Sequence, residues 1–382
     1  MSRNANLDLL RAVAVTMVIL GHLPDAPRES ALAVLWVADW FRHYGGLGVD
    51  LFFVLSGFLV SGLLFRDYLA HGRADVPRFL IRRGFKIYPA FYVFIILTFL
   101  LRLRAGDSLT WRNLLSELLF VQNYGPYVWS HTWSLAVEEH FYLLLAAIVM
   151  ALCRWLPRAP LERIPVIFWC TTAAVFVARA VTIAHAPYAT PTHRFPTHLQ
   201  IDALFTGVVL SYYYHTDARL ALVIRRYAPW LAVASACCLV LAHSLPDPTT
   251  RYLAGHLLTN AGFGALVLIA VALASPAGWL GRAVARIGAQ SYSVYLWHQA
   301  VLGFGVVLVP RLIGRPVTFY ETVAWYVPLA FVIGVLAAKC IEFPALRLRD
   351  LIFPDDRSRA VAVPGLTAAV SQPASSARSV AT

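Results

Sequence analysis

Long apolar segments recur along the whole chain, and they limit its fold more than any other feature. Apolar runs of about 17 to 23 residues match a helix that crosses the hydrocarbon core of a bilayer. We place such runs near residues 7–22, 45–65, 87–101, 131–152, 165–186, 198–215, 229–245, 253–275, 289–309 and 324–343. Backbone in lipid must satisfy its polar groups internally, so these segments form helices. The sequence predicts an all-α, polytopic membrane protein with a bundle of about ten transmembrane helices.

Charge and composition agree with this class. The 382-residue chain is 59% hydrophobic and 14% charged, which lies outside the averages of soluble domains. The net charge of +12 would also suit nucleic acid, but the Arg and Lys residues are spread over short loops instead of forming one basic face. Most of them lie in loops on the side of the N-terminus, which predicts that both termini are cytoplasmic. We expect the lipid bilayer, and no nucleic acid, as a partner.

The two ends of the chain need separate interpretation. The first apolar segment is interrupted by Arg11, and no small-residue cleavage site follows His22, so we expect no signal-peptide cleavage there. From Pro354 onward the chain is rich in Pro, Ser and Ala, a composition typical of disorder. We predict a transmembrane domain over residues 1–345 and a cytoplasmic, disordered tail over residues 346–382.

Arg11 and His22 are ionisable residues in a segment that is otherwise apolar. They are eleven residues apart, which places them on one helix face roughly 16 Å apart along the axis. Ionisable residues within spans usually face the bundle interior or an aqueous cavity. The alternative is that Arg11 extends to the lipid headgroups and His22 lies at the interface, and spacing alone leaves both interpretations open.

The fourth segment carries a second set of polar residues. His131, Ser134, Glu138 and Tyr142 are spaced i, i+3, i+7 and i+11, so they form one stripe along a helix. A buried glutamate needs a partner, and we expect His22 to be the partner of Glu138. A glutamate can orient a histidine that acts as general base, as in catalytic triads. A purely structural Glu–His pair is the alternative.

The stretch "RFLIRRGFKIYPAFY" places four cations at the cytoplasmic entry of the third segment: Arg78, Arg82, Arg83 and Lys86. Such clusters hold phosphate groups through charge-assisted hydrogen bonds. Anchoring by the positive-inside rule explains the same charges without a ligand.

Two further patterns concern residues inside the bundle. In "SYSVYLWH", Ser291, Tyr295 and His298 are aligned on one helix face and point a polar stripe into the bundle. Arg179 and Asp202 lie at similar depth on adjacent antiparallel segments, so we predict a structural ion pair between them. We expect no metal, because the cysteines lack metal-ligand spacing and no metalloprotease, Walker or dinucleotide motif occurs.

Taken together, these stretches resemble acyltransferase family 3, integral-membrane acyltransferases that modify bacterial surface glycans and some secreted small molecules. The resemblance rests on "LDLLRAVAVTMVILGH", "GVDLFFVLSGFL", "RRGFKIYPAFY", "WSLAVEEHFYLL", "SYSVYLWH" and "EFP", which occur in the family's order over roughly residues 5–345. Two positions depart from the family pattern: Lys86 stands where an arginine is usual, and His140 stands where glutamine is common.

The resemblance implies a donor, an acceptor and residue roles. An acetyl or other short acyl group comes from acyl-coenzyme A in the cytoplasm, and a hydroxyl is acylated on the outer side of a bacterial inner membrane. His22 is implied as the catalytic histidine, Glu138 as part of the site, and Arg11, Arg83 and Lys86 as ligands of the coenzyme's phosphates. Arg82 joins this group as a further candidate. The candidate substrate-binding residues are Asp50, Trp133, Ser134, Glu139, Tyr292 and His298.

The resulting hypothesis is that His22, oriented by Glu138, removes the acceptor's hydroxyl proton as the hydroxyl attacks the thioester carbonyl. An acyl-histidine intermediate is an alternative, and Tyr292, Tyr295 or backbone amides are candidate donors to the oxyanion. We expect a polar channel between the first, second, fourth and ninth segments.

The acceptor stays open between lipopolysaccharide O-antigen, exopolysaccharide, a lipid-linked oligosaccharide and a macrolide-like metabolite. The longest outer loop is too short to fold as an added domain, so we expect the bundle and its loops to recognise the acceptor. The competing class is a multi-span transporter or flippase of a polar substrate, because buried charges suit translocation as well. The sequence leaves the oligomeric state open.

Overall fold

The computed structural model describes residues 4–274 and 278–354, and within these ranges all regular structure is helical. The α-helices are α1 (Ala5–Gly21), α2 (Leu32–Tyr44), α3 (Leu47–His71), α4 (Val76–Arg104), α5 (Trp111–Leu118), α6 (Trp133–Trp155), α7 (Ile164–His185), α8 (Thr190–His193), α9 (Ile201–Thr216), α10 (Leu220–Ser244), α11 (Pro248–Thr250), α12 (His256–Ala272), α13 (Trp279–Gly288), α14 (Ser291–Ile313), α15 (Phe319–Ala337) and α16 (Phe343–Ile352). Short 3-10 or π-helical turns complete the set: η1 (Ser130–Thr132), η2 (Pro160–Arg163), η3 (Thr197–Leu199), η4 (Arg251–Gly255) and η5 (Ala338–Glu342). The all-α prediction is confirmed for the described part of the chain.

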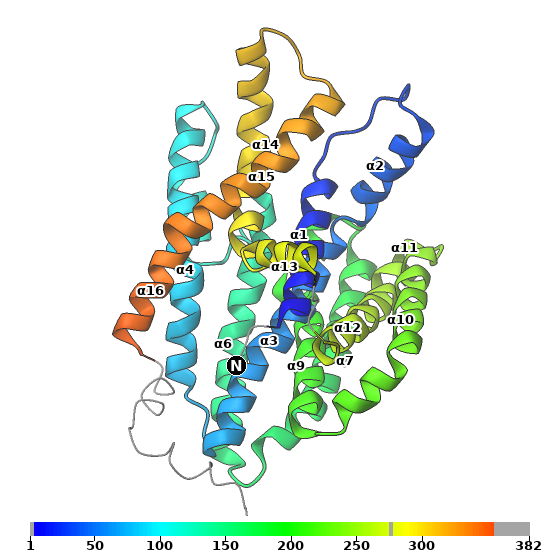
Figure 1. Ribbon diagram of the computed structural model, residues 1–382, viewed down its shortest axis with the longest axis vertical. Coiled ribbons are helices and arrows are strands. Elements are labelled where there is room, and N and C mark those ends of the chain that lie inside the picture. Colours follow the sequence, from blue (N-terminus) through cyan, green and yellow to red (C-terminus); the bar gives the residue numbers. More distant parts are fainter. Residues whose placement is uncertain (1–3, 275–277, 355–382) are drawn as a thin grey trace, which may run out of the picture.

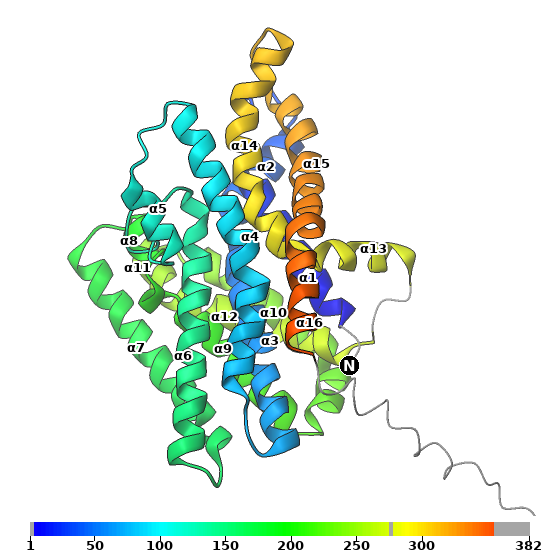
Figure 2. The same cartoon turned by 90° about the vertical axis from the view of Figure 1, so that its left-hand side faces the viewer.

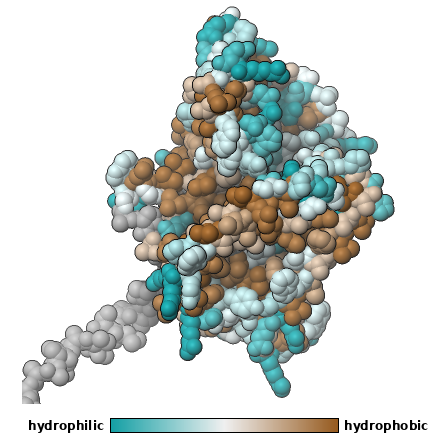
Figure 3. All heavy atoms as spheres, turned by 90° about the vertical axis from the view of Figure 1, so that its right-hand side faces the viewer, coloured by the Kyte–Doolittle hydropathy of each residue, from teal (hydrophilic) through white to brown (hydrophobic). Residues whose placement is uncertain are grey.

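Each of the ten expected segments coincides with a helix, but not all are long enough to be counted as spans. Among the described residues, eight helical segments are long and apolar enough to cross a membrane. The other two expected spans are α1 and α9, with 17 and 16 residues. Figure 3 shows apolar side chains in a broad band across the middle of the molecule, with hydrophilic residues above and below it. The chain is therefore a multi-pass membrane protein, while the count of ten and the side of the termini remain predictions.

Successive long helices run in opposite directions, which gives the bundle two ends. The connection from α3 to α4 lies at the lower end of Figure 1, and the connection from α14 to α15 lies at the upper end. We call the lower end, on whose side α1 begins, the N face. The upper end, toward which α1 runs to end beside His22, is called the H face.

The centre of the bundle depends on close contact between α3 and α9. A Cβ atom added at Gly57 would collide with the backbone of Leu204, and one added at Gly207 would collide with the backbone of Val54. Small residues let transmembrane helices approach to backbone contact in this way. This contact fixes α3 in the centre of the bundle, where it can contribute to the site.

The expected ion pair between α7 and α9 is confirmed. Arg179 donates two hydrogen bonds to Asp202, of 3.0 and 2.9 Å, and both side chains are buried. Arg179 also donates to the carbonyl of Leu199, and Asn260 donates to Asp202. The pair is a fully enclosed structural element that ties α7 to α9.

Several helices were not expected from the apolar segments. The helix α2 has no buried residue, and α13 is a short amphipathic helix that runs across the bundle instead of along it (Figures 1 and 2). At the C-terminal end, α16 extends to Ile352, so the expected domain boundary at residue 345 falls inside a helix. Most of the expected tail, from residue 355 onward, lies outside the described residues.

Candidate active site

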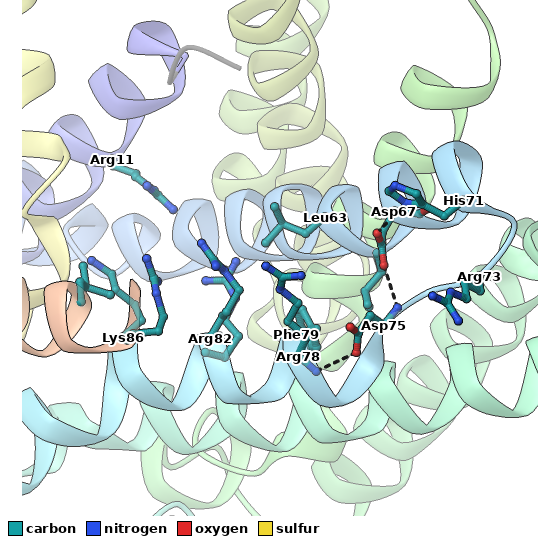
Figure 4. Close-up of a pocket in the computed structure, with 14 residues that line it drawn as sticks. Arg11, Leu63, Asp67, His71, Arg73, Asp75, Arg78, Phe79, Arg82 and Lys86 are labelled. Carbon is teal, nitrogen blue, oxygen red and sulfur yellow. Dashed lines mark hydrogen bonds and ion pairs between the residues drawn. The ribbon is translucent and has the colours of Figure 1, made fainter. Parts of the chain in front are cut away.

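A basic cavity of about 580 Å³ lies on the side of the N face, between α1, α3, α4 and α16. Figure 4 shows Arg11 of α1 directed toward the row of cations on α4. The cationic residues that line the cavity are Arg11, Arg73, Arg78, Arg82, Arg83, Lys86 and Arg349. The structure therefore brings together Arg11, Arg82, Arg83 and Lys86, the candidate ligands of the coenzyme's phosphates. Such a concentration of Arg and Lys suits a ligand with several phosphate groups.

Local contacts hold the cavity wall in place. Asp75 caps α4 by accepting a hydrogen bond of 3.1 Å from the backbone of Arg78, and its own backbone N–H donates to Asp67 (Figure 4). Lys86 binds Glu342, a buried residue of the π-helical turn η5. Ser293 of α14 donates to the other oxygen of Glu342 at 2.7 Å. The glutamate of the "EFP" motif thus joins α4 to α14 behind the cavity.

A second, narrow cavity of about 100 Å³ continues from the first, and we call it the passage. The two cavities share three lining residues: Arg11, Arg83 and Lys86. Its apolar lining comes mainly from α3, and its polar lining comes from α3, α6 and α14: Ser56, Ser134, Glu138, Tyr142, Ser291, Tyr292 and Tyr295. The passage lies where the sequence predicts a channel, with α4 as an additional wall.

Hydrogen bonds tie most of the hydroxyl groups of the passage to their neighbours. Tyr142 donates to Glu138 at 2.6 Å, and the Tyr142 and Ser56 hydroxyls are 2.7 Å apart. Tyr292 donates to the carbonyl of Ile87 at 3.1 Å, and Tyr295 donates to the carbonyl of His131 at 2.8 Å. Because both of these tyrosine hydroxyls already donate to backbone carbonyls, neither is free to bind an oxyanion in this arrangement.

Three imidazole rings lie beyond the passage, and we call them the histidine cluster. The ring centroid of His298 is 5.0 Å from that of His22 and 4.9 Å from that of His131. His131 and His298 are buried, whereas His22 is exposed to a cavity of about 1140 Å³ on the side of the H face. Among the described residues, no group of three or more His, Cys, Asp or Glu is placed to hold a metal ion.

The expected pair of Glu138 and His22 is not formed, which corrects the sequence interpretation. Glu138 follows His131 by seven residues, so it lies about 10 Å deeper along α6 than the histidine cluster. Its partners are in the passage, and the side chain nitrogen Nδ1 of His22 contacts the carbonyl of Val18 at 2.7 Å instead. The group that orients His22 is therefore a backbone carbonyl of its own helix.

Glu139 is also placed differently from the expectation. It faces α4, where the hydroxyl of Tyr88 donates to it, and it does not line the passage. Adjacent residues of a helix point about 100° apart, so only one of the two glutamates can face the passage.

Asp50 and Trp133 both contact Arg194, a residue of the loop between α8 and η3. Arg194 donates to Asp50 at 2.8 Å and to the carbonyl of Gly46 at 2.9 Å, and its guanidinium lies 5.8 Å from the ring centroid of Trp133. Asp50 and Arg194 line a separate cavity of about 320 Å³ near the H face. Asp50 is a buried acid at the start of α3, and a buried acid needs a cationic partner. That need was the signal for an arginine from elsewhere in the chain.

Glu117 of α5 was also missed. It is fully buried, and one carboxylate oxygen accepts hydrogen bonds from the backbone N–H groups of Val128 and Trp129 and from the hydroxyl of Thr132, at 2.9, 3.2 and 2.9 Å. Burial raises the pKa of the Glu117 carboxyl to about 7, against the opposing effect of these donors. Glu117 therefore holds the turn that carries His131. The signal available in the sequence was that Glu117 is the single acid within the largely apolar stretch "LLSELLF".

Comparisons with known proteins agree with this geometry. A family model described as an acyltransferase domain matches residues 4–341. The peptidoglycan O-acetyltransferase OatA of Listeria monocytogenes is 26% identical over 366 residues, which cover 89% of this chain and 55% of that protein. The putative O-acetyltransferase SACOL0978 and the O-acetyltransferase OatA, both of Staphylococcus aureus, are 25% identical over 78% of this chain and 50% of theirs. The chain spans about half the length of these curated relatives. No solved structure matches it.

Proposed function

Because this chain belongs to acyltransferase family 3, we propose that it is a membrane-embedded O-acetyltransferase. It transfers an acetyl or other short acyl group from acyl-coenzyme A to a hydroxyl group of a glycan. The relatives named as O-acetyltransferases support the reaction type, and the name of the Listeria relative supports a cell-wall glycan as the class of acceptor.

The donor enters from the N face, which the proposal takes as the cytoplasmic side of the bacterial inner membrane. The phosphates of coenzyme A bind in the basic cavity, where Arg11, Arg82 and Arg83 supply charge-assisted hydrogen bonds. Lys86 contributes charge while its ammonium group is held by Glu342. A bidentate contact is left to the arginines, because lysine binds phosphate as a point charge.

The observation that carries the proposal is the continuity between the basic cavity and the passage. Arg11 and Arg83 belong to both, so a ligand anchored by its phosphates has an exit toward the bundle centre. The passage is narrow and is lined by both apolar and polar side chains, which suits the thin pantetheine arm of the coenzyme. It ends at Ser134 and Tyr295, whose hydroxyl oxygens are 2.6 Å apart. The ring of Tyr295 contacts that of His298, so this end is adjacent to the histidine cluster.

His22 acts as the general base in this proposal. The carbonyl of Val18 can only accept a hydrogen bond, so Nδ1 of His22 carries the proton and Nε2 keeps its lone pair. That nitrogen removes the proton of the acceptor hydroxyl as the oxygen attacks the thioester carbonyl. The acceptor approaches from the H face through the large cavity, whose lining includes Trp129, Gln299 and Trp325. Aromatic rings and an amide are groups that suit sugar binding.

The test is the release of free thiol from acetyl-coenzyme A by the purified chain in nanodiscs, with a panel of glycan acceptors. We expect acceptor-dependent release that is lost in His22→Ala. The matched control is His185→Ala, because His185 also contacts the carbonyl four residues before it but lies exposed at the end of α7. Release that survives His22→Ala would remove His22 from the mechanism. No release with any acceptor would favour a transporter or flippase.

A further inference from the structure

The histidine cluster shows the same arrangement three times. Nδ1 of His22 contacts the carbonyl of Val18, Nδ1 of His298 contacts the carbonyl of Tyr295, and Nε2 of His131 contacts the carbonyl of Leu296 at 3.1 Å. A carbonyl accepts and never donates, so each of these nitrogens carries a proton. The other nitrogen of each neutral ring is therefore a hydrogen-bond acceptor.

Two of these acceptor nitrogens are buried without a donor. Nδ1 of His131 and Nε2 of His298 have no hydrogen bond of regular geometry among the described residues, and the side chain of Gln299 lies beside His131. Leaving a buried polar atom unpaired lowers stability, and such atoms are few in native proteins. An apolar side chain of similar size would fill the same space without an unpaired polar atom. The two lone pairs are therefore unused acceptor positions at which a donor could bind.

No described acid or base competes for this proton within the cluster. Arg194 lies toward the H face and is held by Asp50. Glu138 of α6 lies deeper and accepts from Tyr142. Asp25, in the loop after α1, pairs with Arg42. From α14 the titratable group is Tyr295, whose hydroxyl already donates to the carbonyl of His131. The three rings are thus the groups placed to hold a positive charge at this point.

We propose that His298, supported by His131, shares the proton that His22 takes from the acceptor hydroxyl. His22 and His298 are in ring contact at 5.0 Å between centroids, which lets their nitrogens reach hydrogen-bond distance. Once the proton is on Nε2 of His22, a turn of the ring directs this N–H from the acceptor oxygen to Nε2 of His298, and the charge-assisted bond stabilises the imidazolium. His298 acts through His22, so it is a positioning residue and not the base itself.

This inference rests on the proposed acyl transfer, whose atoms balance as follows. The O–H bond of the acceptor breaks, its proton moves to Nε2 of His22, and the oxygen forms a C–O bond with the acyl carbon. The C–S bond of the thioester breaks, and the proton leaves the cluster for the thiolate to give free coenzyme A. The cluster ends the cycle neutral, with its lone pairs unpaired again.

The test compares two substitutions of His298 in the full chain in nanodiscs. His298→Met keeps the side-chain size but offers no good acceptor, whereas His298→Gln offers an amide oxygen in place of Nε2 and an N–H for the carbonyl of Tyr295. Because His298→Met removes a hydrogen bond to a charged group, we expect it to lower kcat by about 10- to 100-fold. We expect His298→Gln to keep much of the wild-type kcat. KM for acetyl-coenzyme A should not change, because the basic cavity lies elsewhere. His215→Met is the control, since its ring also contacts a backbone carbonyl of its own helix, that of Ser211, and packs on aromatic rings.

Two readouts separate proton sharing from a structural role. The acidic limb of the kcat profile between about pH 5 and 9 should move to lower pH in His298→Met, because His22 loses the acceptor that stabilises its protonated form. Labelling of His22 by diethylpyrocarbonate, followed by mass spectrometry, should show the same shift without any acceptor present. Unchanged limbs in both measurements would overturn the inference. If the wild type releases no thiol with any acceptor, the proposed function fails, and the labelling shift still decides whether the proton is shared.

Discussion

The buried pair of Arg179 and Asp202 gives a quantitative test of the bundle. Both side chains are almost fully buried, and Arg179 donates four hydrogen bonds, two to Asp202 and two to the carbonyl of Leu199. Replacing Arg179 by Met leaves the Asp202 carboxylate with Asn260 as its remaining side-chain donor. Removing one partner of a buried ion pair typically costs 3 to 5 kcal/mol, because the other charge stays in a medium of low dielectric. We expect Arg179→Met to destabilise the protein by about that amount.

The assay is reversible unfolding in mixed detergent micelles, followed by far-UV circular dichroism, for the two single variants and the double variant. The double variant Arg179→Met with Asp202→Leu removes both charges, so we expect it to lie within about 2 kcal/mol of the wild type. The coupling energy between the two sites then accounts for most of the cost of the single variants. If the double variant loses as much stability as the sum of the single variants, the two charges do not stabilise each other and the reasoning is wrong.

Three further outcomes are expected. Arg83→Gln should raise KM for acetyl-coenzyme A by about 10- to 100-fold with a smaller effect on kcat, because a charge-assisted phosphate contact is lost. The control is Arg104→Gln, which changes a charge at the far end of α4 and should leave both constants unchanged. Gly57→Ala should lower stability by about 1 to 3 kcal/mol in thermal unfolding, because the added Cβ collides with the backbone of α9, whereas Gly278→Ala meets nothing within 4 Å and serves as control. Glu117 should make stability fall as pH rises from 4.5 to about 7, since the folded carboxyl holds its proton over that window; a wild-type profile that matches Glu117→Gln between these pH values would contradict the burial argument.

The positions of the long helices could be predicted because each one contains an apolar run of transmembrane length. The short helices could not be predicted in this way. The helix α13 has 10 residues and α5 has 8, so neither contains such a run, and their amphipathic faces have meaning only beside a neighbouring helix. The helix α2 buries none of its residues, so no core pattern marks it. Apolar length is a local property, whereas an amphipathic face depends on what covers it.

The sequence predicts which site residues share a face of one helix, but it does not predict which residues of different helices lie side by side. The stripe from His131 to Tyr142 and the pair of Arg179 and Asp202 follow from the helical repeat and from matching depth. Glu138 was assigned to His22 because both were placed in the outer half of the membrane. The 3-10 turn η1 instead brings His131 against His298, which contacts His22, and leaves Glu138 in the passage. Relative axial position is set by loops and turns, and helix periodicity contains no information about it.

The histidine cluster also has an electrical consequence. The passage and the large cavity on the H face share no lining residue, and the buried rings of His131, His298 and Tyr295 lie between Ser134 and the exposed ring of His22. Within the described residues these two cavities are separate from each other, so neither of them forms an open path for ions across the bundle. The three rings therefore act as a closed partition between the side where the donor would bind and the side where the acceptor would bind.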